Sequence, residues 1–151
     1  MPIDLIISKS IDINSMPPAV WDVLISPEKI AQYFSGAETV TNWKIGSEII
    51  FAHNYEGKEF KNKGTILEFE PNHLLKYTYW TIFSKTEDKS ENYTTITYIL
   101  TDTDGKTKLS LTQTNFKNIE WFQGLEMGWD LVLAKIKELA EENNYRQTEA
   151  L

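Results

Sequence analysis

The chain has 151 residues, a length that suits one domain and leaves no room for a second. Its composition is 41% hydrophobic and 25% charged, so it can bury enough apolar surface to offset the entropy of ordering. A net charge of −7, with no local cluster of Lys and Arg, makes nucleic acid and anionic membrane surfaces poor partners. The sequence contains no Cys, which excludes disulfides, thiolate nucleophiles and Cys-ligated zinc.

The N-terminal segment, MPIDLIISKSIDIN, predicts a strand over residues 3–14, because its apolar and polar residues are interleaved. It has no basic stretch followed by an apolar one, and the sequence has no run of about 18 apolar residues. We therefore expect no membrane insertion and a cytoplasmic protein.

Two short helices are predicted after this strand. The first begins near Pro18, because Pro is tolerated in a first helical turn, where its missing N–H would have no partner. Ser26 and Pro27 end that helix and open a second, which runs to Phe34.

A period of two between residues 47 and 115 predicts an antiparallel meander. Turn-forming residues separate its strands, and the Asp104-Gly105 pair is a strong hairpin signal. The expected strands cover residues 48–51, 65–69, 74–83, 93–100 and 108–114.

A long amphipathic helix is predicted over residues 119–142, where apolar side chains recur at spacings of three and four. Residues 144–151 are predicted to form a polar tail, so residues 1–143 make up the single domain. The apolar face of the sheet and the apolar stripe of the helix each need a partner. The fold class is therefore α+β, with a curved antiparallel sheet wrapped around the C-terminal helix.

Eight motifs, in this order, resemble the START-like (SRPBCC) superfamily, and in particular its branch similar to the activator of the heat-shock-protein-90 ATPase. They cover nearly the whole chain, and together they are specific for fold and family but not for activity. They are PAVWDVL (18–24), SPEKI (26–30), YF (33–34), WKIGSEI (43–49), GTILEFEP (64–71), LLKY (74–77), LSLTQ (109–113) and GWDLVLAKI (128–136).

The sequence departs from the family pattern at three positions. Tyr33 stands where the family often has Trp, Ser47 replaces the second of two frequent glycines, and Gln113 occupies a position where relatives often have His. Because Gln cannot titrate, the last departure weakens any inherited argument for acid–base chemistry.

The resemblance implies a helix-grip (START-like, Bet v-like) fold with a deep cavity between the sheet and the long helix. Various relatives hold apolar small molecules in this cavity. Some relatives are enzymes, such as aromatase/cyclases, whereas others only bind a ligand or act on a chaperone. Fold alone does not choose among these functions.

Strand alternation, the helix stripe and the family pattern together give a set of predicted ligand-binding residues. Affinity would come from apolar walls, and orientation from His53, Tyr79 and Gln113. The set is Phe34, Trp43, Phe51, His53, Tyr77, Tyr79, Tyr98, Gln113, Trp121, Leu125, Trp129 and Val132.

For the polar residues of this set, a purely structural role stays open as the alternative to ligand binding. Gln113 could be a buried amide satisfied by backbone groups and tyrosine hydroxyls, and His53 could be a surface residue where its strand enters a turn. The two histidines stand apart in the sequence, so we expect no metal site and no cofactor. Glu68 and Glu70 are interpreted as a solvated strand edge, and no catalytic residue is assigned.

The leading hypothesis is a non-catalytic protein, related to stress or chaperone function, that holds an apolar or amphipathic small molecule. The alternatives are a chaperone partner that activates the heat-shock-protein-90 ATPase, and an enzyme of the cyclase, dehydratase or hydrolase type. His53 would be the group that titrates near neutral pH in such an enzyme. The chain could be a monomer or a homodimer, because Leu74, Trp80 and Ile82 would form an exposed apolar patch if they point outward.

Overall fold

The computed structural model describes residues 4–149, with side chains described as far as Glu142. Strand β1 (Ile7–Ile13) leads into helices α1 (Pro17–Ile25) and α2 (Pro27–Tyr33), and the chain ends in helix α3 (Ile119–Glu149). The strands between these helices are β2 (Glu38–Val40), β3 (Glu48–Tyr55), β4 (Lys58–Glu70), β5 (Leu74–Tyr79), β6 (Thr94–Thr103) and β7 (Lys106–Thr114). Two short 3₁₀ turns, Ile82–Ser84 and Ser90–Asn92, connect β5 to β6.

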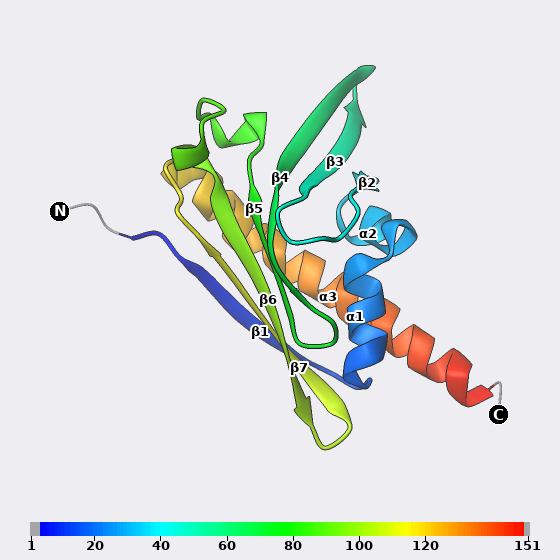
Figure 1. The fold of residues 1–151 in the computed structure, drawn as a ribbon. Coiled ribbons are helices and arrows are strands. Elements are labelled where there is room, and N and C mark those ends of the chain that lie inside the picture. The colour runs from blue at the N-terminus through cyan, green and yellow to red at the C-terminus, as the bar shows by residue number, and fades with distance from the viewer. Residues whose placement is uncertain (1–3, 150–151) are drawn as a thin grey trace.

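The strands form one antiparallel seven-stranded sheet with the order β1-β7-β6-β5-β4-β3-β2. It curves around α3, and α1 and α2 lie beside that helix (Figure 1). Alternate residues of each strand face the helix and form the core, as Ile96, Tyr98 and Leu100 do in β6. The predicted α+β class and the helix gripped by a curved sheet are confirmed.

Several element boundaries differ from the prediction. β2 was not predicted, and β4 begins at Lys58 rather than near residue 65. β5 ends at Tyr79, because Thr81 accepts a hydrogen bond from the Phe83 N–H and opens a 3₁₀ turn. The chain reaches Glu149 as helix, where a polar tail was expected from residue 144, because the sequence there has no Gly or Pro to end it. Residues 150 and 151 of the expected tail lie outside the described residues.

The outward-facing apolar side chains around β5 are only partly covered. Ile82 is exposed, whereas Leu74 and Trp80 are half-buried. The Trp80 ring stacks on Tyr93, with 6.4 Å between ring centroids, and its indole N–H donates to Thr86. The connection between β5 and β6 therefore covers Trp80, whereas Ile82 remains exposed.

Gly64 permits a close approach between β4 and β5. A Cβ atom at this position would lie 1.6 Å from the carbonyl oxygen of Thr78, which no ordinary shift of a side chain can relieve. The pairing register between the two strands also shifts between Ile66 and Glu68. The bend of the sheet at this point depends on the missing side chain, since bulges and glycines are where sheets curve.

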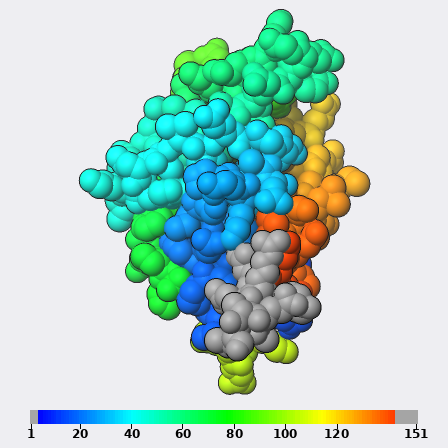
Figure 2. Space-filling view, turned by 90° about the vertical axis from the view of Figure 1, so that its right-hand side faces the viewer, coloured from blue at the N-terminus to red at the C-terminus, as the bar shows by residue number. Residues whose placement is uncertain are grey.

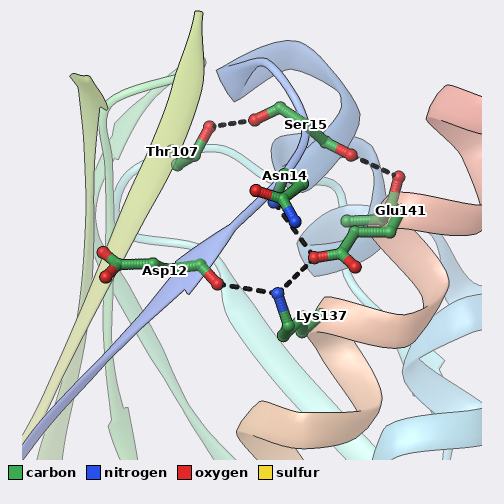
Figure 3. A network of polar contacts seen from close by, with 7 residues as sticks. Asp12, Asn14, Ser15, Thr107, Lys137 and Glu141 are labelled. Atoms are coloured by element: carbon green, nitrogen blue, oxygen red, sulfur yellow. Dashed lines mark hydrogen bonds and ion pairs between the residues drawn. The ribbon is translucent and has the colours of Figure 1, made fainter. Parts of the chain in front are cut away.

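A network of polar contacts fixes the C-terminal half of α3 to the junction between β1 and α1 (Figure 3). The Ser15 hydroxyl donates to the carbonyl oxygen of Ala140 at 2.8 Å, and the Asn14 N–H donates to the Glu141 carboxylate at 3.0 Å. Lys137 donates to the backbone carbonyl of Asp12 and pairs with Glu141. Burial opposes ionisation of Glu141, but these contacts outweigh it and lower its pKa.

Burial changes along the described part of α3. Leu133, Ile136 and Ala140 are buried, whereas Trp121 and Leu125, nearer the start of the helix, are half-exposed. Figure 2 shows the orange surface of α3 beside the blue surface of α1 and α2. Among residues 4–149, no helix combines the length and apolarity needed to cross a membrane.

Replacing Gly64 with Ala should destabilise the fold by about 2 kcal/mol or more, because β4 and β5 must separate to admit the methyl group. Urea unfolding measures the change. Gly124→Ala is the matched control, since a Cβ there meets nothing within 4 Å and Ala should stabilise α3 by up to about 1 kcal/mol. Equal stability of Gly64→Ala and the wild type would contradict the close approach.

Candidate functional site

Two adjoining cavities lie between the sheet and the N-terminal half of α3. The hairpin-side cavity, of about 430 Å³, opens beside the β3–β4 hairpin, and the helix-side cavity, of about 480 Å³, opens beside α2. Both cavities are lined by Tyr33, Phe34, Ser35, Tyr79, Leu125 and Val132. The hairpin-side cavity adds Phe51, His53, Asn54, Tyr55, Phe60, Asn62, Thr81, Phe83 and Trp121, and the helix-side cavity adds Gln32, Ile96, Gln113, Gly128, Trp129, Leu131 and Lys135.

The pairing of β3 with β4 builds one wall of the hairpin-side cavity. Phe51 lies opposite Asn62, and His53 lies opposite Phe60. Because residues opposite each other in a sheet share a face, all four side chains point to the same side. This inward face continues the buried face of both strands into the wall of the hairpin-side cavity, which Trp121 and Leu125 of α3 also line.

Aromatic side chains form the common wall of the two cavities. The Phe34 ring contacts Phe51 on the sheet and Trp129 on α3, with centroid distances of 5.5 and 6.1 Å and edge-to-face geometry. Phe34 caps the C-terminus of α2, directly after Tyr33, and the chain then turns through Ser35 and Gly36, both with positive φ. The turn directs the aromatic ring inward, between sheet and helix.

Gln113 joins the sheet to α3 at the inner end of the helix-side cavity. Its side chain is 1% exposed, and its Oε1 accepts a hydrogen bond from the Trp129 indole N–H at 2.8 Å. Its Nε2 donates to the Thr94 hydroxyl at 3.0 Å, and that hydroxyl donates to the carbonyl oxygen of Tyr79. The amide is therefore buried and hydrogen-bonded, with Trp129 and Thr94 as partners in place of the expected tyrosine hydroxyls, and its role in binding stays a prediction.

His53 lies in the wall of the hairpin-side cavity and is half-buried. Burial lowers the pKa of its imidazole, and a hydrogen bond with the backbone of Ser35 offsets part of that effect. The ring is therefore neutral at neutral pH. A neutral imidazole can both donate and accept a hydrogen bond.

Three of the twelve predicted ligand-binding residues lie outside both cavities. Tyr77 and Tyr98 are fully buried in the core, where desolvation raises the pKa of each hydroxyl well above its usual value. Trp43 packs on Phe69, which in turn contacts Trp21 of α1. The other nine residues line one cavity or both, and their role in binding stays a prediction.

Asn62 is a cavity residue that sequence reasoning missed. It is 5% exposed and lies within the polar run KEFKNK, which gives little sign of a strand. The alternation of Phe60, Asn62, Gly64 and Ile66 is the signal that could have placed it inside. Its Oδ1 is one of the buried side-chain oxygens without a hydrogen-bond partner in the described part of the chain, together with atoms of Thr39 and Tyr98.

A further hollow, on the outer face of the sheet, is lined mainly by polar side chains that bind one another. Lys63 pairs with Asp88 at 2.6 Å, and Tyr93 donates to the same carboxylate at 2.5 Å. These contacts fasten the connection between β5 and β6 to β4. Across the described residues, no group of three or more His, Asp or Glu side chains is placed to hold a metal ion.

Comparison with known proteins gives a family and a set of similar structures. The family described as "Activator of Hsp90 ATPase homolog 1-like protein" matches residues 14–141. The solution structure of ChR145 from Cytophaga hutchinsonii is 32% identical, with a TM-score of 0.80 over 96% of this chain and 99% of that one. Protein MLL2253 from Mesorhizobium loti, at 20% identity and a TM-score of 0.75 over 91% and 97% of the two chains, shares the fold. No curated protein matches.

Replacing Gln113 with Leu should lower the free energy of unfolding by about 1–3 kcal/mol, because the buried indole N–H of Trp129 loses its acceptor. Urea unfolding measures the loss. Gln123→Leu makes the same chemical change at an exposed position of α3 and should stay within about 0.5 kcal/mol of the wild type. A Gln113→Leu protein as stable as the wild type would show that the bridge contributes nothing.

Proposed function

The chain belongs to the family of Activator of Hsp90 ATPase homolog 1-like proteins, and for this member we propose a non-catalytic role in holding a small apolar or amphipathic molecule. The binding site is the pair of cavities between the sheet and the N-terminal half of α3. The observation that carries this proposal is that two cavities, each large enough for a small molecule, share six wall residues.

The composition of the walls supports an apolar ligand. Rings and aliphatic side chains dominate both cavities, and ligand pockets in proteins are mostly apolar with a few placed polar groups. Phe34 stands between them, in contact with both sheet and helix. Both cavities reach the surface, where Tyr55 and Phe83 of one and Leu131 of the other are exposed, so a ligand can enter.

The state of the polar groups supports holding rather than chemistry. Both ends of the Gln113 amide are hydrogen-bonded to protein side chains. Burial raises the pKa of the Tyr33 hydroxyl, which donates to the carbonyl oxygen of Leu24. These groups are already used to fix the walls in place, and they remain protonated or neutral at neutral pH.

A bulkier side chain on the wall that both cavities share should abolish ligand binding. Val132 lines both cavities, so Val132→Phe should place a ring where a ligand lies. A thermal-shift screen over lipids, aromatics and polyketides should find compounds that stabilise the wild type. Ligand at a hundredfold excess over Kd adds about 2.7 kcal/mol, or several degrees in Tm.

Met127→Phe provides the control for this experiment. Met127 lies on the same helix, is 76% exposed and lines neither cavity, so this variant should respond to ligands as the wild type does. If no compound class stabilises the wild type, the proposal is wrong. If Val132→Phe still binds the selected compounds, they bind elsewhere.

The family description favours a second candidate, activation of the Hsp90 ATPase. The direct test is ATP turnover by purified Hsp90 with this protein in high excess. From the binding proposal we expect unchanged turnover. A rise in turnover that Val132→Phe retains would instead assign the chaperone role to a surface of the protein outside the cavities.

A further inference from the structure

Asn62 occupies the sheet wall of the hairpin-side cavity. It lies on β4, opposite Phe51 on β3, and faces the same interior as that ring. The residue is only 5% exposed. Among the described residues that line the two cavities, it is the one with a buried oxygen that has no hydrogen-bond partner.

An unpartnered buried amide oxygen is an unusual feature of a folded protein. Most buried polar side-chain atoms are hydrogen-bonded, since water's hydrogen bonds are lost on burial and must be replaced. A strand residue facing an aromatic wall would be more stable as Leu or Val. The Asn62 amide is therefore suited to a partner that enters the cavity.

Tyr79 provides a second polar group beside this amide. The Asn62 side chain interacts with the Tyr79 hydroxyl, and burial raises the pKa of that hydroxyl well above its usual value. Tyr79 therefore keeps its proton at any ordinary pH and can donate it. Together, the amide oxygen of Asn62 and the hydroxyl of Tyr79 offer one acceptor and one donor, which suits a group that also donates and accepts.

The wall of this cavity carries no formal charge. None of the described residues that line it is Lys, Arg, Asp or Glu, and its one imidazole, His53, has a pKa lowered by burial. An anionic or cationic head group would enter without a counter-charge and would lose its hydration. A neutral head group meets no such cost.

We propose that the ligand of the hairpin-side cavity is an uncharged molecule with a ring-containing apolar body and a hydroxyl group that donates a hydrogen bond to Asn62 Oδ1. The aromatic wall around Phe51 and Phe34 receives the body, and Asn62 with Tyr79 receives the hydroxyl. This inference rests on the proposed function and specifies which small molecules the site accepts. Fatty acids and other carboxylates are excluded as preferred ligands of this cavity.

Three compounds with the same biphenyl body test the inference by isothermal titration calorimetry at neutral pH. They are 4-phenylphenol, its methyl ether 4-methoxybiphenyl, and biphenyl-4-carboxylate. The phenol should bind the wild type about three- to tenfold more tightly than the ether, which cannot donate a hydrogen bond. The carboxylate should bind more weakly than either.

Asn62→Leu should remove the preference for the phenol over the ether and leave the ether's affinity unchanged or higher. Its Tm without ligand should stay close to that of the wild type, because an unpartnered acceptor is replaced by an apolar group while the contact of the amide with the Tyr79 hydroxyl is lost. Gln123→Leu, an amide-to-leucine change at an exposed position outside both cavities, should keep the preference. If Asn62→Leu proves unstable, comparing the affinities of the three compounds for the wild type still tests the inference.

The outcomes separate the two proposals. Equal binding of phenol and ether to the wild type, a preference that survives Asn62→Leu, or tighter binding of the carboxylate would each overturn the inference while leaving the binding role intact. Absence of binding by all three, together with a negative thermal-shift screen, would overturn the proposed function itself, and the inference with it.

Discussion

The packing of the sheet against α3 is the constraint on which the rest of the structure depends. The apolar stripe of the helix and the concave face of the sheet must cover each other. They do so most closely between residues 133 and 140 of α3, around Leu133 and Ile136. Contacts of Asn14 and Ser15 with α3 fix that part of the helix in place. Nearer the start of α3, Trp121 and Leu125 are only half-buried, and the cavities lie between this part of the helix and the sheet.

Two sets of interactions keep this space open. Edge-to-face contacts hold Phe34 between Phe51 and Trp129, so the rings support one another rather than collapsing into the gap. The Gln113 amide ties Trp129 to the sheet, because its oxygen accepts from the indole N–H and its nitrogen donates to Thr94. Asn62, by contrast, retains an unused acceptor. The site thus combines a rigid wall with one polar group left for a ligand.

Periodicity and turn chemistry predicted most of the elements. The Asp104-Gly105 turn closes the β6–β7 hairpin, and both residues have the positive φ that such a turn requires. The N-terminal part of β4 was missed, because KEFKNK is polar and its strand structure comes from pairing with β3. Trp43 was expected in the cavity but packs on Phe69, since an aromatic side chain can serve any apolar cluster that lies within its reach.

The helix stripe, the strand alternation and eight ordered motifs were enough to predict the fold class and the family. They also identified most of the aromatic residues that form the walls. Which polar side chains are hydrogen-bonded became clear from the folded chain alone. Gln113 finds its partners on α3 and β6, whereas the Oδ1 of Asn62 finds none among the described residues. Hydrogen-bond satisfaction depends on atoms supplied by distant segments, which local periodicity does not specify.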